Sequence, residues 1–220
     1  MVNNRQKVLI PQIQGKVIKK DMINKIRYGN TNTFLIRGTR ANLLIDTDYA
    51  GTLQAFYKVI KEQGIKISDI NYILATHYHP DHIGLVSELM DRGVKLIVME
   101  SQTDFVHYSD SIFAKEPRLN YKPIDENKAL VLSFDDAVSF LDSLGISGDI
   151  FPVKSHSEDS ICVALHDGTF IAGDLEPYEY LEAYKDNYPL RKDWNSILKQ
   201  NPKLILYAHA NEKRIDNYKK

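Results

Sequence analysis

The segment from Thr76 to Gly84 reads T-H-Y-H-P-D-H-I-G and carries three histidines and an aspartate within six residues. His77 and His79 are two positions apart, so in an extended turn their rings can converge on one cation. Asp81 and His82 follow at an expected helix start and face elsewhere, which suits a second cation nearby. Imidazole and carboxylate ligands favour zinc, with manganese and iron as alternatives. The competing interpretation is an ordinary helix cap beside solvated histidines.

Three more potential ligands follow apolar segments with the pattern of strands. His156 lies in a polar loop between two expected strands, Asp174 follows F-I-A-G, and His209 follows L-I-L-Y-A. Open α/β sheets place their ligands at strand ends, so a shared position there would bring the three together. Each residue alone is a weak signal, because a histidine or aspartate after a strand is usually a surface or turn residue.

The elements that must position these residues alternate between strand and helix patterns, which predicts an α/β fold with mixed sheets. We expect strands at 8–13, 16–18, 33–37, 42–46, 71–75, 95–99, 149–152, 161–165, 169–172 and 203–208. We expect helices at 52–63, 83–92, 102–114, 133–144 and 190–199. With no linker or repeat in the sequence, residues 1–220 are predicted to form one domain. In it, residues 101–148 would form a helical cover over the site, its aromatic residues Phe105, Tyr108, Phe113 and Tyr121 either lining a pocket or packing.

Composition excludes several classes of protein. The chain has 220 residues and a formal net charge of −1, which argues against a dedicated duplex-DNA binder. One cysteine, Cys162, excludes an internal disulfide framework, and its place in an apolar strand pattern predicts core packing. The apolar stretch Val8–Ile10 is too short for the core of a signal peptide, and no run is long enough for a membrane helix. We therefore expect a cytoplasmic protein with no membrane partner.

The complete H-x-H-x-D-H pattern, the early Asn32-Thr33, the strand ending in Ile45-Asp46-Thr47 and the three later residues resemble the metallo-β-lactamase-fold superfamily of metallohydrolases. The resemblance extends from about Ile26 to Ala210. It implies an αββα sandwich, in which two mixed sheets are flanked by helices and the metals lie at one edge.

The resemblance also implies an allocation of ligands. The first metal would be held by His77, His79 and His156, the second by Asp81, His82 and His209, with Asp174 and a hydroxide bridging both. Asp81 would also orient the hydroxide. Two positions depart from the family pattern. Val153-Lys154-Ser155 precedes His156 in place of the usual Pro-Gly, which leaves Lys154 able to project toward substrate. Asp48 stands where glycine is frequent, and it would be either a turn residue or a negative charge near the rim of the site.

Other residues are assigned from their context. Tyr178, four residues after Asp174, would either donate a hydrogen bond to a substrate oxygen or pack as a lid aromatic. Tyr78 is expected to pack away from the metals. His107 and His166 are expected on the surface.

These observations favour a dinuclear metal-dependent hydrolase acting on a small ester, thioester or lactone. The resemblance argues against antibiotic hydrolysis, because true zinc β-lactamases lack the bridging acid. The first alternative is a phosphodiesterase acting on nucleotides or short nucleic acid, with a phosphate-binding rim of Arg118, Lys122, Lys154, Arg191 and Lys192. A less favoured alternative is an iron-dependent oxidoreductase, and a metal-binding module without catalysis is the last. The sequence leaves the substrate, the metal and the oligomeric state open.

Overall fold

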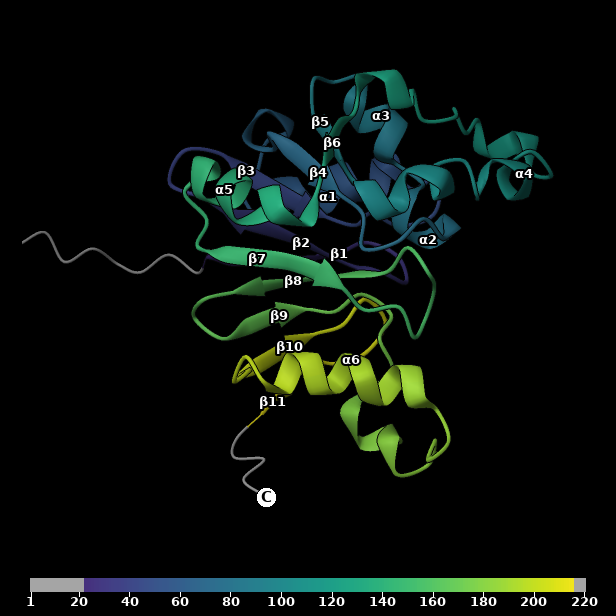
Figure 1. Ribbon diagram of the computed structural model, residues 1–220. Helices are drawn as coiled ribbons and strands as arrows, with labels where there is room; N and C mark the ends of the chain where they lie inside the picture. Colours follow the sequence, from purple (N-terminus) through teal and green to yellow (C-terminus); the bar gives the residue numbers. More distant parts are fainter. Residues whose placement is uncertain (1–21, 216–220) are drawn as a thin grey trace, which may run out of the picture.

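The computed structural model describes residues 22–215, and all strands in that range belong to two stacked sheets (Figure 1). The expected strands at 8–13 and 16–18 lie outside the described residues. The first sheet contains, in spatial order, β1 (Ile23–Arg27), β2 (Asn32–Arg37), β3 (Asn42–Ile45), β4 (Tyr72–Leu74), β5 (Lys95–Met99) and β6 (Leu130–Leu132). The second contains β11 (Lys213–Arg214), β10 (Leu204–Leu206), β9 (Thr169–Ile171), β8 (Ile161–Leu165) and β7 (Gly148–Pro152).

Both sheets are mixed, as predicted. In the first, β1 to β3 pair antiparallel and β3 to β6 pair parallel. In the second, β7, β8 and β9 are antiparallel neighbours, β9 pairs parallel with β10, and β10 pairs antiparallel with β11. The turn His166-Asp167-Gly168 joins β8 to β9, with Gly168 at a φ of 96°.

The alternation of side chains along the strands divides the core into layers. In β2, Phe34 and Ile36 face the second sheet, whereas Leu35 packs on the outer side. Helices α1 (Leu53–Glu62) and α3 (Val86–Met90) contribute to that outer layer. Helix α6 (Tyr188–Leu198) covers the outer face of the second sheet (Figure 1), where its Trp194 is fully buried. The arrangement is the predicted αββα sandwich.

The expected helix at 83–92 is wrong in one respect, because the structure divides it into α2 (Pro80–Ile83) and α3. Thr47 explains the break. Its backbone N–H donates to the His82 carbonyl at 2.9 Å, and its Oγ1 accepts from the Leu85 N–H at 3.2 Å. Gly84 packs so closely on the backbone of residues 48–50 that a Cβ would collide with it. The helical hydrogen-bond pattern therefore stops at Gly84, and the bonds to Thr47 hold the motif against the first sheet.

The expected helix at 102–114 is also wrong. The structure has a 3-10 helix (Glu100–Phe105) and a short α4 (Asp110–Phe113). Buried Gln102 donates to the Ala75 and Asp159 carbonyls, and the Ser109 hydroxyl donates to the Tyr78 carbonyl at 2.6 Å. These contacts tie the segment to the end of β4 and override its helical periodicity.

The remainder of the expected cover is not wholly helical. After the short 3-10 helices Pro117–Leu119 and Glu126–Lys128, β6 adds an edge strand to the first sheet. Helix α5 (Phe134–Leu144) packs into the core between the sheets. Strand β6 has exposed leucine and valine side chains, which is why its residues have no clear strand pattern. The remaining 3-10 helices are Ile67–Asp69 and Tyr178–Leu181.

Among residues 22–215, no helix is both long and apolar enough to cross a bilayer.

Candidate metal centre

The histidine motif begins where β4 leaves the first sheet. Two buried aspartates hold it there. The Thr76 N–H donates to Asp46 Oδ1 at 2.6 Å, and the Tyr78 N–H donates to Asp159 Oδ2 at 2.7 Å. The Thr76 carbonyl accepts from the Ile161 N–H of the second sheet at 2.9 Å. The motif is therefore fixed to both sheets at one edge of the sandwich.

Three imidazoles form the first group of the centre. His79 Nδ1 lies 3.0 Å from His77 Nε2 and 3.2 Å from His156 Nε2. His77 is buried and His156 is exposed, so the group extends from the core to the surface. Donor atoms around a tetrahedral ion at about 2.0–2.1 Å lie roughly 3.3 Å from each other. The spacing of these nitrogens fits one such ion.

Asp81, His82 and His209 form the second group. His209 Nε2 lies 3.1 Å from Asp81 Oδ2 and 3.3 Å from Asp174 Oδ1, and His82 Nε2 lies 3.3 Å from the same Asp174 oxygen. Asp81 and His82 lie on α2, which follows β4, and His209 follows β10, so the two sheets both contribute to this group.

Asp174 lies between the two groups and presents a different oxygen to each. Its Oδ2 is 3.8 Å from His77 Nε2 and 3.6 Å from His156 Nε2, whereas its Oδ1 faces His82 and His209. A carboxylate in this position can bind one ion with each oxygen.

Contacts outside the two groups fix the orientation of the rings. His82 Nδ1 lies 3.1 Å from Asp46 Oδ2, and His209 Nδ1 lies 3.3 Å from the Asn30 carbonyl. A proton on each Nδ1 leaves Nε2 as the basic nitrogen, which is how such hydrogen-bond acceptors prepare an imidazole to bind metal. The Thr31 hydroxyl donates to the Asp81 carbonyl at 2.7 Å.

The electrostatics of four residues match the ligand forms that a cation requires, whereas carboxylates raise the pKa of His82 and of His209, so a bound cation would displace a proton from each of these two rings. Burial lowers the pKa of His77 and of His156, which keeps both imidazoles neutral. The contact with His209 lowers the pKa of Asp81 to about 2. Burial raises the pKa of Asp174, but the histidines around it outweigh that effect and hold its pKa at about 2.

Two buried atoms of the centre have no hydrogen-bond partner among the described residues: His82 Nε2 and Asp174 Oδ1. They face each other at 3.3 Å without forming a hydrogen bond. Leaving buried polar atoms unpaired costs about 1–3 kcal/mol each, so native sites seldom do so without a ligand. His77, His82 and Asp174 form a further set whose potential ligand atoms lie within 4.8 Å of one another, so the residues fit a divalent metal ion.

Other predicted residues occupy the following places. Tyr78 is 1% exposed and packs in the outer core of the first sheet, and Cys162 is fully buried, both as expected. His166 is exposed and contacts the Ser147 hydroxyl. His107 is on the surface, 2.8 Å from an Asp110 carboxylate oxygen.

The sequence left two interpretations open for each of two residues, Tyr178 and Asp48, and the structure shows the contacts of both. The Tyr178 ring packs edge-on against Trp194 at 5.3 Å, which agrees with its packing interpretation, while its role toward substrate stays a prediction. Asp48 is 3% exposed and accepts from the N–H groups of Thr31 and Tyr49, so its carboxylate is used in internal contacts rather than at the rim.

Of the five cations expected to form a phosphate-binding rim, three have partners within the protein and two have no ion pair in the part of the chain that the structure describes. Arg118 pairs with Glu116, Lys122 pairs with Asp91, and the Arg191 guanidinium donates to backbone carbonyls. Among residues 22–215, Lys154 and Lys192 have no carboxylate within ion-pair distance.

Of the four aromatic residues expected to line a pocket or to pack, three pack in or against the core and one is exposed. Phe113 and Tyr121 stack on each other at 4.1 Å, and Phe105 is partly buried against the same core. Tyr108 is 55% exposed, and its ring centroid lies 5.5 Å from that of His79. It is therefore the member of the set that borders the candidate metal centre.

Sequence reasoning missed the roles of Asp46, Asp159 and Gln102, which hold the motif in place. Asp46 was part of the quoted strand end, and its φ of 59° is a conformation that aspartate tolerates better than most residues. The other two had no local signal, because each acts on a segment that is distant in the sequence.

Comparison with known proteins finds similarity to one superfamily. A model of the metallo-beta-lactamase superfamily matches residues 26–209. The chain is 24% identical over 187 residues to the beta-lactamase-like protein 2 homolog of Drosophila melanogaster, covering 82% of this chain and 59% of that protein. It is 24% identical to an atrochrysone carboxyl ACP thioesterase of Pseudocercospora fijiensis, covering 84% of this chain and 49% of the relative. The chain thus spans about half to three fifths of the length of these two relatives.

Solved structures share the fold at low sequence identity. A metallo-beta-lactamase family protein from Thermus thermophilus superposes with a TM-score of 0.65 at 20% identity, covering 88% of this chain and 73% of that one. The DIM-1 metallo-beta-lactamase superposes with a TM-score of 0.60 at 15% identity, covering 89% of both chains.

Proposed function

Because this chain belongs to the metallo-β-lactamase superfamily, we propose that it is a dinuclear metal-dependent hydrolase of a small ester, thioester or lactone. We propose that His77, His79 and His156 hold one ion, that Asp81, His82 and His209 hold the other, and that Asp174 binds both. Zinc suits this set of imidazoles and carboxylates, with manganese and iron as the alternatives.

The observation that carries the proposal is the division of Asp174 between the two groups. Its Oδ2 faces His77 and His156, and its Oδ1 faces His82 and His209. Bound divalent ions would supply Lewis acidity and lower the pKa of a bound water. The thioesterase name of one relative supports an acyl substrate.

The side chains of the chain supply the remaining functions. The Asp81 carboxylate is partly exposed beside His209 and can accept a hydrogen bond from the attacking water, which orients it. With its pKa at about 2, Asp81 stays ionised at neutral pH and serves as an acceptor rather than as an acid. Tyr108, whose ring borders His79, and Tyr178, four residues after Asp174, are the aromatic candidates for substrate contact.

A second candidate function is iron-dependent redox chemistry. The chain is 31% identical over 121 residues to the flavo-diiron protein FprA2 of Clostridium acetobutylicum, covering 54% of this chain and 29% of that protein. Imidazole and carboxylate ligands also accept iron, so the metal content separates the two candidates.

The test combines metal content with turnover. Untagged protein is analysed by inductively coupled plasma mass spectrometry and then assayed on esters, thioesters and lactones. We expect about two zinc or manganese ions per chain and hydrolysis that is lost in His79→Ala. His166→Ala is the matched control, because that exposed ring contacts Ser147 and lies outside both groups. Iron with no hydrolysis would favour the redox candidate, and full activity in His79→Ala would refute the site.

A further inference from the structure

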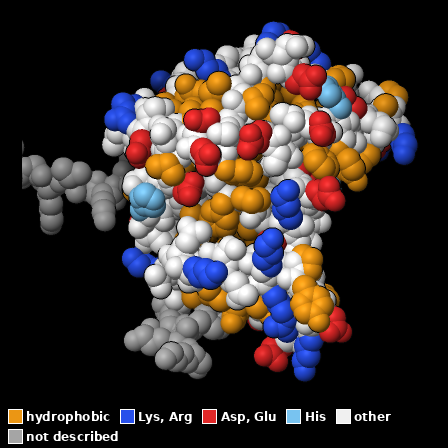
Figure 2. Space-filling model, in the orientation of Figure 1, with side chains coloured by type: hydrophobic (Ala, Val, Ile, Leu, Met, Phe, Trp, Pro, Cys, Tyr) orange, Lys and Arg blue, Asp and Glu red, His pale blue; other side chains and the backbone are white. Residues whose placement is uncertain are grey.

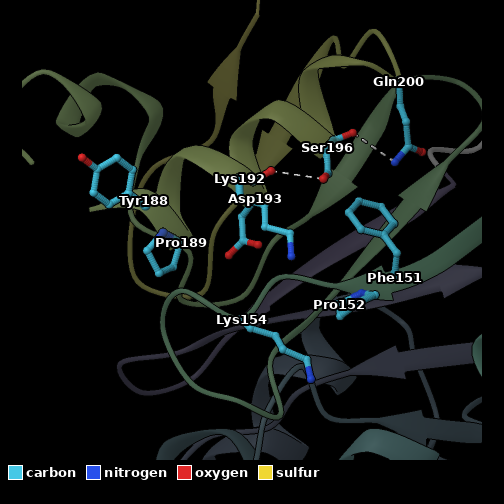
Figure 3. A pocket seen from close by; sticks show the side chains of 9 residues that line it. All are labelled: Phe151, Pro152, Lys154, Tyr188, Pro189, Lys192, Asp193, Ser196 and Gln200. Carbon is cyan, nitrogen blue, oxygen red and sulfur yellow. Dashed lines mark hydrogen bonds between the residues drawn. The ribbon is translucent and has the colours of Figure 1, made fainter. Parts of the chain in front are cut away.

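A groove of about 760 Å³ opens between α6 and the end of β7 with the segment that follows it. Its volume is in the range of small-molecule sites, which is about 300–1,000 Å³. Figure 3 shows its walls, with α6 on one side and Phe151, Pro152 and Lys154 on the other. The remaining lining residues are Tyr188, Pro189, Lys192, Asp193, Ser196 and Gln200.

The groove combines apolar surface with two cations. Phe151, Pro152 and Pro189 provide apolar walls, and the exposed Tyr188 ring stands at one end (Figure 3). Lys154 and Lys192 line the groove on opposite walls, and neither ammonium group has a carboxylate within 4.0 Å among the described residues. In Figure 3 the Lys192 side chain points from α6 toward the opposite wall, whereas the Lys154 side chain points away from α6. In Figure 2, Lys and Arg side chains gather along α6 beside apolar side chains on this face.

Asp193 sets the net charge of the groove. It is 7% exposed, and its Oδ2 accepts from the Ser155 N–H at 2.7 Å, so this carboxylate is used internally. Two lysines and one aspartate give the lining a formal charge of +1. A single negative charge on a ligand would therefore balance it.

The groove adjoins the candidate metal centre through the chain itself. Lys154 and His156 are two residues apart, so their Cα atoms are separated by at most about 7 Å. The Ser155 N–H, between them, is fixed to Asp193 on α6. A ligand held between the two lysines would thus lie beside the loop that presents His156.

From these contacts we propose that the groove binds the end of the substrate distant from the bond that is hydrolysed, and that this end is an apolar chain or ring bearing one carboxylate. Lys192 pairs with the carboxylate and Lys154 joins it by a rotation of its exposed side chain, while Phe151 and Tyr188 contact the apolar part. The identification of this ligand as substrate rests on the proposed function, whereas its binding does not.

Binding is tested first, without turnover. Isothermal titration calorimetry of the full-length, metal-loaded protein compares 4-phenylbutyrate with its neutral analogue 4-phenylbutanamide. We expect the acid to bind at least tenfold more tightly than the amide. In the double variant Lys154→Gln/Lys192→Gln this preference should fall at least tenfold, and higher salt should reduce it in the wild type.

The controls separate the groove from other anion sites. Lys58→Gln removes an exposed lysine from α1, on the far side of the first sheet, and should leave the preference unchanged. The metal ions remain in the double variant, so any carboxylate bound to them would still be detected. Equal binding of acid and amide by the wild type, or an unchanged preference in the double variant, would overturn the proposal.

Kinetics then tests the assignment to substrate. The 4-nitrophenyl monoester of adipic acid, which keeps a free carboxylate, is compared with its methyl diester. We expect a lower KM for the anionic ester in the wild type, and loss of that preference in the double variant with little change in kcat. Hydrolysis of both esters with equal KM would refute the substrate assignment. Specific binding of the acid with no hydrolysis of any ester would refute the proposed function and leave the groove as a binding site.

Discussion

Asp46→Asn is the sharpest perturbation of the centre, because it changes a buried contact of His82 without altering any of the seven candidate ligands. The Asp46 carboxylate is 1% exposed and contacts the Thr76 N–H at 2.6 Å, the Thr76 hydroxyl at 2.8 Å and His82 Nδ1 at 3.1 Å. Asparagine has the same size and tolerates the φ of 59°. We therefore expect the backbone around residue 46 to keep its conformation in this variant.

The expected cost follows from those contacts. The amide oxygen can still accept from Thr76, but the amide NH₂ then faces His82 Nδ1. That arrangement favours the ring form with its proton on Nε2, the atom that would bind metal. Loss of one charge-assisted hydrogen bond in the core should reduce the free energy of unfolding by roughly 2–3 kcal/mol. Metal affinity should fall about 10–100-fold, the usual effect of losing such an orienting partner.

Two measurements check these values. Metal Kd is obtained by competition with a chromophoric chelator at pH 7.5, and stability is obtained from urea unfolding of the metal-free protein. Asp48→Asn is the matched control, since Asp48 is also buried and accepts two backbone N–H groups but contacts no candidate ligand. It should lose stability and keep its metal Kd within about twofold. If Asp46→Asn bound metal as tightly as the wild type, the orienting role of Asp46 would be wrong.

Three further predictions concern pH, substrate contact and packing. Burial lowers the pKa of His82, but Asp46 and Asp174 outweigh it and raise that pKa from 6.5 to about 10. The protonated ring therefore stabilises the folded, metal-free protein fully below pH 6.5, and this stabilisation is lost as pH rises through 10. The Tm of metal-free protein should accordingly fall between pH 6.5 and 10, and less so in Asp46→Asn; identical profiles would contradict this. Tyr108→Ala should raise KM severalfold with little change in kcat, because the exposed ring borders His79, and a loss confined to kcat would refute that role. Gly84→Ala should destabilise the fold by roughly 3 kcal/mol in urea unfolding, because its Cβ would meet backbone, and a change under about 0.5 kcal/mol would show that the turn can relax.

The sequence was most informative where chemistry and periodicity coincide. The spacing of His77 and His79 predicted that they would share one group, and the strand ends predicted that His156, Asp174 and His209 would join the motif. The structure brings all seven residues together, while their action as metal ligands stays a prediction. Long apolar strands such as β5 and β8 were predicted within one residue, because their burial leaves a continuous apolar run.

The errors arise where distant parts of the chain decide the local conformation. Thr47 interrupts the helix at Gly84, and Gln102 holds a segment with α-helical periodicity in a 3-10 helix. β1 alternates only weakly in burial, and β11 has two residues, so neither has a pattern that could be detected. The orienting role of Asp46 was hidden for the same reason, since its partner His82 is 36 residues further along the chain.

The position of the centre links its assembly to the packing of the two sheets. The motif after β4 comes from the first sheet, whereas His156, Asp174 and His209 come from loops of the second. Direct contacts already join the sheets beside the site: Thr76 bonds to Ile161, and buried Asn32 bonds to the carbonyls of residues close to His209 on either side. Ions held by both ligand groups would add to these contacts only when the sheets are packed, because the unfolded chain has no such arrangement. Metal binding would therefore stabilise the folded state by mass action, and the same geometry that brings Asp174 between the two groups also makes the centre a link between the sheets.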